Sequence, residues 1–187
     1  MHRGCTMRFL SRQECATWLE RSGMSMGPDL SPRMSAKAYR GFAVVTPEAV
    51  GQLITFLRAV WLNSADGQAA LQLLTSWNMF DGTEHIPLMR SLRSAFGATH
   101  EIEIQPGAVS EAGELDDALS LFLTSGLFRW DFWLVPRASD GIVVFHSHDG
   151  FIEVYVPVNH EGDVEHEFSY WKTEIRALRP RSGSDYY

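Results

Sequence analysis

Residues 128–157, FRWDFWLVPRASDGIVVFHSHDGFIEVYVP, carry the pattern that decides the fold. Valine, isoleucine and aromatic residues dominate three runs, and these residue types are enriched in strands. The runs cover residues 128–135, 142–148 and 151–157, and short connections that contain glycine separate them. Because such connections join neighbouring antiparallel strands, the segment predicts a three-stranded meander that forms the nucleus of a sheet.

The residues before the meander are predicted mainly as helices. Ser11 and Glu14 form a capping-box pattern at the start of a helix over residues 11–22. Apolar residues from Val50 to Trp61 recur at the i, i+3, i+4 and i+7 spacing, which predicts a helix after Pro47. Further helices are predicted over residues 67–78, 84–96 and 110–126 and, after the meander, 163–178. Strands are predicted over residues 41–45 and 100–105.

Helices therefore precede a block of strands, an order that favours an α+β fold over a doubly wound parallel sheet. We predict a helix-rich N-terminal two-thirds packed on a mainly antiparallel sheet. The C-terminal three-stranded meander, at about 128–157, and a closing C-terminal helix complete this fold. At 187 residues the chain fits a single domain over residues 1–187, with residues 1–8 and 180–187 flexible.

The connection between the second and third strands contains Asp149-Gly150, a dipeptide that favours a two-residue hairpin turn. Counting outward from this turn places His146 opposite Glu153 and puts His148 on the same face of the hairpin. That face is predicted to point away from the core. Two imidazoles on one strand and a carboxylate across from them can converge on a divalent transition metal. His146, His148 and Glu153 are therefore the candidate metal ligands.

These three residues form the run H-x-H-x4-E, which resembles part of the first metal-binding motif of the cupins. The resemblance covers only this run, and it implies metal-ligand roles for His146, His148 and Glu153. The glycine that precedes the first histidine of that motif is displaced here to Gly141, and the second cupin motif has no counterpart in the chain. A cupin barrel also differs from the helix-rich fold predicted above. The alternative is an ordinary polar hairpin face with a cross-strand pair of His146 and Glu153.

The first strand of the meander has two different faces. The more apolar face, predicted to lie against the core, contains Phe128, Trp130, Phe132 and Leu134. The other face presents Arg129, Asp131 and Trp133, and Tyr155 joins them if the strands pair as a meander. Because Arg, Trp and Tyr are enriched at binding hot spots, these four residues are the candidate protein-binding residues. The alternative is that helices cover this face and make it a second core.

Composition and short motifs limit the class of partner, the cellular compartment and the chemistry that the sequence predicts. The formal net charge of −7 disfavours nucleic acid and anionic membranes as partners. Two cysteines without the spacing of a disulfide framework indicate a reduced, cytoplasmic protein. The sequence contains no nucleophile-elbow, Walker or dinucleotide fingerprint, so whether the chain is an enzyme stays open.

We therefore expect a non-catalytic soluble protein-binding domain that needs no cofactor and whose partner is another protein. In size and charge the chain is similar to immunity proteins, which are small bacterial inhibitors of toxins, so an immunity-type or regulatory inhibitor is the expected role. Association with a second copy of the chain is left open. The alternative function is a metal-binding protein or a metal-dependent enzyme, in which His146, His148 and Glu153 hold a divalent transition metal.

Overall fold

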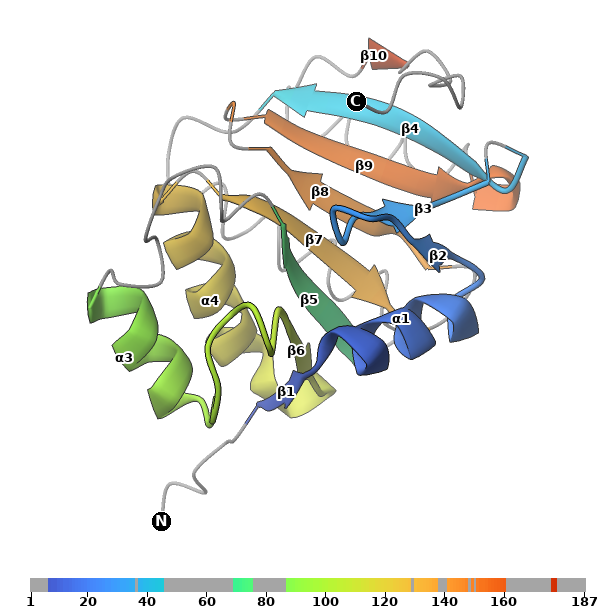
Figure 1. The fold of residues 1–187 in the computed structure, drawn as a ribbon. Coiled ribbons are helices and arrows are strands. Elements are labelled where there is room, and N and C mark those ends of the chain that lie inside the picture. The colour runs from blue at the N-terminus through green and yellow to red at the C-terminus, as the bar shows by residue number, and fades with distance from the viewer. Residues whose placement is uncertain are drawn as a thin grey trace.

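The computed structural model describes residues 7–35, 37–45, 69–75, 87–128, 130–137, 141–147, 149, 151–160 and 176–177. Within them, an eight-stranded antiparallel sheet forms the body of the protein, with the strand order β1-β6-β5-β7-β8-β9-β4-β10 (Figure 1). Its strands are β1 (Arg8–Leu10), β4 (Tyr39–Val45), β5 (Ala70–Thr75), β6 (Gly107–Ser110), β7 (Asp131–Pro136), β8 (Val143–His146), β9 (Phe151–Pro157) and β10 (Arg176–Ala177). A separate hairpin pairs β2 (Ser25–Met26) with β3 (Pro32–Arg33).

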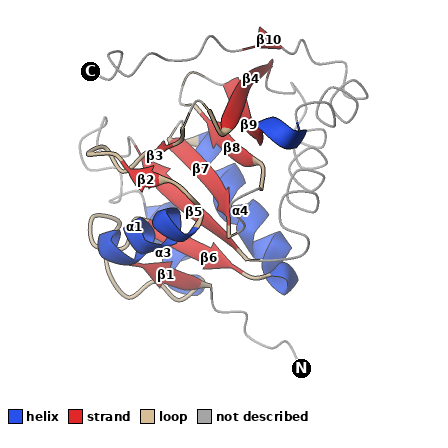
Figure 2. Cartoon of the chain, turned by 90° about the vertical axis from the view of Figure 1, so that its right-hand side faces the viewer, coloured by secondary structure: helices blue, strands red, loops and turns tan. Residues whose placement is uncertain are grey.

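Helices cover both faces of this sheet. The described residues contain α1 (Arg12–Arg21), α3 (Pro87–Ala95) and α4 (Leu115–Leu127), and single turns of 3-10 helix at Ala112–Glu114 and Val158–His160. Figure 2 shows α1 and α4 on opposite sides of the strands, and α3 packs on the same side as α4. We call the two sides the α1 face and the α4 face. None of the described helices is long and apolar enough to cross a membrane.

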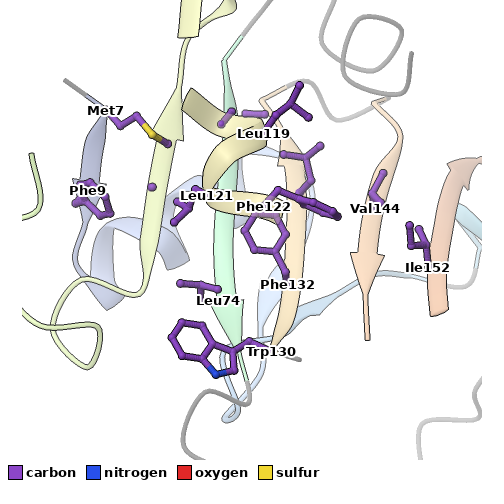
Figure 3. Close-up of a cluster of buried hydrophobic side chains, with 14 of the residues drawn as sticks. Met7, Phe9, Leu74, Leu119, Leu121, Phe122, Trp130, Phe132, Val144 and Ile152 are labelled. Carbon is purple, nitrogen blue, oxygen red and sulfur yellow. The ribbon is translucent and has the colours of Figure 1, made fainter. Parts of the chain in front are cut away.

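The central strand β7 is buried on both faces. Phe132 and Leu134 point to the α4 face, where Phe122 of α4 meets Phe132 edge-on with 4.7 Å between ring centroids (Figure 3). Trp133 and Val135 point to the α1 face and belong to a second cluster of buried side chains. Two hydrophobic cores therefore lie on either side of one sheet, and β7 contributes to both.

The predicted fold class is wrong, because the described part of the N-terminal two-thirds contains six strands, β1 to β6, and three helices, α1, α3 and α4, and four of those strands belong to the main sheet. β5 occupies the region in which the sequence predicts a helix over residues 67–78. All six of its residues are buried, since the strand lies between β6 and β7 and is covered on both faces. Periodicity does not distinguish such a continuous apolar run from a buried helix.

Residues 100–105 form a turn and not the predicted strand. Ile102 is fully buried whereas Ile104 is 55% exposed, so the two side chains do not share an inward face. The buried Arg93 of α3 donates hydrogen bonds to two carbonyl oxygens of this turn, at 3.1 and 3.3 Å. The strand in this part of the chain is β6, whose residues GAVS are small and carry little strand signal.

Several predicted elements are confirmed. The Ser11 hydroxyl accepts a hydrogen bond from the Glu14 amide at the start of α1, and the Glu14 carboxylate accepts one from the Ser11 amide at 2.8 Å. β4, α3, α4 and the three strands of the meander also lie in the predicted regions. The helix predicted after Pro47 lies outside the described residues. The closing helix also lies outside them except for Arg176–Ala177, which form β10 beside β4.

Candidate functional site

The connection between β8 and β9 determines which side chains share a face. Phe145 pairs with Glu153, His146 pairs with Ile152, and the Ser147 N–H donates to the Phe151 carbonyl at 2.9 Å. Residues 148–150 therefore connect the strands, and the predicted two-residue turn is wrong. Side chains alternate between the two faces of a strand. This difference of one residue therefore places each side chain of β9 on the opposite face, relative to β8, from the one that the predicted register gives it.

The predicted metal ligands are consequently not brought together. His146 lies on the α4 face and Glu153 on the α1 face, while His148 lies outside the described residues. Among the residues that the structure describes, no group of three His, Cys, Asp or Glu side chains could hold a metal ion. The predicted register is wrong, and metal binding itself stays a prediction.

His146 lies in the core beneath α4. Its ring meets Phe122 edge-on with 5.7 Å between ring centroids, and a Cβ at Gly126 would lie 3.6 Å from the imidazole. Burial lowers the pKa of His146, while a hydrogen bond with the Trp130 backbone and the charge of Asp131 act in the opposite direction. Its Nδ1 atom is buried without a hydrogen-bond partner in the described part of the chain. The imidazole is therefore neutral near pH 7.

Four residues of the meander form a compact group on the α1 face, which we call the Trp133 cluster: Trp133, Phe145, Glu153 and Tyr155. Trp133 stacks on Phe145 with 4.3 Å between ring centroids and on Tyr155 with 5.9 Å. The Tyr155 hydroxyl donates a hydrogen bond to Oε2 of Glu153. The stacked rings and this hydrogen bond together fix the position of the Tyr155 side chain.

Most of the Trp133 cluster is buried. Trp133 is 7% exposed and Glu153 is 3% exposed, whereas Tyr155 is half-buried. The indole N–H of Trp133 has no acceptor among the described residues. Trp18 of α1 packs on the same face and donates from its indole nitrogen to the Val135 carbonyl at 3.3 Å. The α1 face is therefore a second core, and Tyr155 is the member of the cluster that reaches the surface.

Three of the four predicted protein-binding residues are described. Asp131, Trp133 and Tyr155 share the α1 face, and the structure brings Trp133 and Tyr155 into contact. Asp131 is buried, and Arg129 lies outside the described residues. Phe145 is the member of the group that the sequence interpretation misses. The predicted register assigns Phe145 to the face opposite Glu153 and Tyr155, so no signal in the sequence alone places it beside them.

The one described cysteine does not have the properties of a nucleophile. Cys15 lies in α1 and is fully buried. Burial raises its pKa to about 12, so the thiol is protonated near pH 7. Because the thiolate is the reactive form, Cys15 contributes packing and not chemistry.

Comparison with protein-family models, with curated proteins and with solved structures found no match to this chain. The fold and the site alone therefore define its class, which is an antiparallel sheet covered by helices on both faces. The candidate functional residue is the half-buried tyrosine at the margin of one core.

Proposed function

We propose that this chain is a non-catalytic protein-binding domain whose contact surface is centred on Tyr155. The observation that carries the proposal is the way this side chain is held, with its ring stacked on Trp133 and its hydroxyl bonded to Glu153. A ring fixed before binding loses little conformational entropy when a partner docks on it. Tyrosine is also among the residue types that dominate binding energy at interfaces, because it combines a large apolar area with a polar group.

The surroundings of Tyr155 support a protein partner. Phe151 is also half-buried, and its ring meets Phe145 edge-on with 6.4 Å between centroids, so a second aromatic side chain extends the surface. Buried Trp133 and Phe145 support both outer rings from below. The net charge of −7 favours a basic partner through electrostatic attraction. A regulatory or immunity-type inhibitor that binds a basic protein is the role that these properties fit.

The test compares Tyr155→Ala with Leu127→Ala. Leu127 is 76% exposed at the end of α4, so its replacement also removes exposed apolar area but leaves the Trp133 cluster intact. Proteins captured by the wild type and by Leu127→Ala, but not by Tyr155→Ala, are purified and titrated by calorimetry. We expect Tyr155→Ala to raise the dissociation constant by about tenfold or more, as for an interface hot spot.

Two results would contradict the proposal. One is that no purified protein binds the wild-type chain in the titration. The other is that a purified partner binds Tyr155→Ala and Leu127→Ala with equal affinity, which would place the interface elsewhere. Urea unfolding of each variant separates a loss of contact from a loss of folding.

A further inference from the structure

The loop between α3 and β6, residues 98–106, is fixed by hydrogen bonds that join its two ends (Figure 1). We call it the α3–β6 loop. Arg93 of α3 is 2% exposed, and its Nη2 atom donates to the carbonyls of His100 and Gln105 at 3.3 and 3.1 Å. The side-chain oxygen of Gln105 accepts hydrogen bonds from the amides of Thr99 and His100, at 3.2 and 3.0 Å. Two side chains therefore each connect the beginning of the loop to its end.

The middle of the α3–β6 loop is anchored in the core. Ile102 is fully buried and belongs to the hydrophobic cluster on the α4 face. The amides of Ile104 and Gln105 both donate to the carbonyl of Glu101, at 3.1 and 2.9 Å, so the chain makes one tight turn around Ile102. A loop that is already ordered gives up little further conformational freedom on binding, which is an advantage for a contact site.

This turn presents one apolar side chain and two carboxylates to the solvent. Ile104 is 55% exposed, and Glu101 and Glu103 are exposed in the same turn. Residues at the centre of a protein interface exclude water from their contact, while charged residues around them select a partner of opposite charge. The turn offers both kinds of group within four consecutive residues.

We infer that the α3–β6 loop is a second protein-contact site, and that it takes a partner segment in which basic side chains flank an apolar one. Ile104 supplies the apolar contact, while Glu101 and Glu103 attract lysine or arginine side chains. The net charge of −7 attracts the same kind of segment. The site goes beyond the proposed function and does not depend on it, because Ile102 anchors the loop in the core on the α4 face whereas Tyr155 lies on the α1 face.

The first experiment titrates three synthetic tetrapeptides into the isotope-labelled protein and follows its backbone amides by NMR. The probes are acetyl-Lys-Leu-Leu-Lys-amide, acetyl-Gln-Leu-Leu-Gln-amide without charge, and acetyl-Lys-Ser-Ser-Lys-amide without apolar side chains. We expect the first probe to shift the amides of residues 99–105 in a saturable manner, and the other two to bind several-fold more weakly. Equal binding of the first and third probes would overturn the apolar contact. Equal shifts at Asp116 and Asp117, in the acidic first turn of α4, would mean non-specific attraction and would overturn the site.

The second experiment repeats the titration of the first probe with variants. Ile104→Ser and the double variant Glu101→Gln, Glu103→Gln should each raise its dissociation constant several-fold. Leu127→Ser is the matched control, because this leucine is 76% exposed at the end of α4. Tyr155→Ala should also leave the dissociation constant unchanged, which separates this site from the surface of the proposed function. An unchanged dissociation constant in both loop variants would overturn the site.

The third experiment tests Gln105 as the positioning residue of the loop. Gln105→Met removes the acceptor, so hydrogen exchange at the amides of Thr99 and His100 should become faster and the first probe should bind more weakly. Gln105→Glu keeps an acceptor and should restore both the slow exchange and the binding. Slow exchange and unchanged binding in Gln105→Met would overturn the positioning role.

Discussion

At the residue scale, the buried polar side chains on the two faces of the sheet differ in their hydrogen-bond partners. His146 lies beneath α4 with its ring against Phe122 and its Nδ1 atom without a hydrogen-bond partner among the described residues, whereas Glu153 on the other face accepts a hydrogen bond from Tyr155. In the sequence these residues belong to one H-x-H-x4-E run, whose resemblance to a cupin motif predicts a shared metal. The spacing of the run contains no information about strand register, which is what separates the two side chains.

The burial of His146 predicts a loss of stability in acid. Burial lowers the pKa of this imidazole below its ordinary value of 6.5, so the unfolded chain binds a proton there before the folded protein does. The free energy of unfolding should therefore decrease as the pH falls below about 6.5. Urea unfolding at roughly pH 7.5 and 5.5 measures this decrease, which should be smaller in His146→Leu. An equal decrease in both proteins would show that other groups are responsible.

Gly107 of β6 predicts a second effect on stability. A Cβ at this position would overlap the Cys15 sulfur and would lie 2.9 Å from Cδ1 of Leu71. We expect Gly107→Ala to lower the free energy of unfolding by about 1–3 kcal/mol, as overpacking does. Adding Cys15→Ala should recover part of this loss, since it removes the overlapping sulfur. Gly113→Ala is the control, because nothing lies within 4 Å of its added Cβ. A similar loss in both glycine variants would contradict the packing explanation.

At the element scale, the sequence predicts elements whose signals are local and misses those whose signals depend on neighbours. The capping box of α1 involves only Ser11 and Glu14, and the strong alternation of the meander identifies β7, β8 and β9. β5 was not predictable as a strand, because burial on both faces removes its alternation. The hairpin register depends on whether its connection has two or three residues, and Asp149-Gly150 alone favours the shorter one.

The observed register predicts that removing metal ions with a chelator does not change the stability of the protein. With His146 on one face of the sheet and Glu153 on the other, the midpoint of urea unfolding should be the same with and without excess EDTA. The protein should be purified without an affinity tag, and its metal content measured by elemental analysis. Near-stoichiometric metal that disappears in the His146→Ala, His148→Ala double variant would contradict this prediction and favour the metal-binding alternative.

At the scale of the whole molecule, one sheet separates two cores. β7 contributes Phe132 to the core under α4 and Trp133 to the core under α1. Among the described residues, the aromatic side chains are therefore explained by burial in these two cores or packing against them, and not only by an exposed contact surface. The sequence alone does not decide whether the α1 face is a second core or an exposed contact surface, because burial of a sheet face depends on where distant helices pack.

Burial of Trp133 predicts a large loss of stability when its side chain is removed. We expect Trp133→Ala to lower the free energy of unfolding by about 3–5 kcal/mol, the range for large-to-small substitutions of buried aromatic residues. Leu127→Ala, at a position that is 76% exposed, should change it by less than about 0.5 kcal/mol. Equilibrium urea unfolding measures both values. A small effect of Trp133→Ala would mean that the α1 face is not a core.

The position of β4 in the sheet also affects how the chain can fold during synthesis. Tyr39 pairs with Pro157, and Val45 pairs with Phe151, so a strand from the first quarter of the chain needs a partner made much later. β1 likewise pairs with β6, at Arg8 and Val109. Such long-range pairing delays folding, because loops must close before the contacts form. On the ribosome, the backbone groups through which β4 pairs with β9 have no native partner until residues 151–157 have left the exit tunnel.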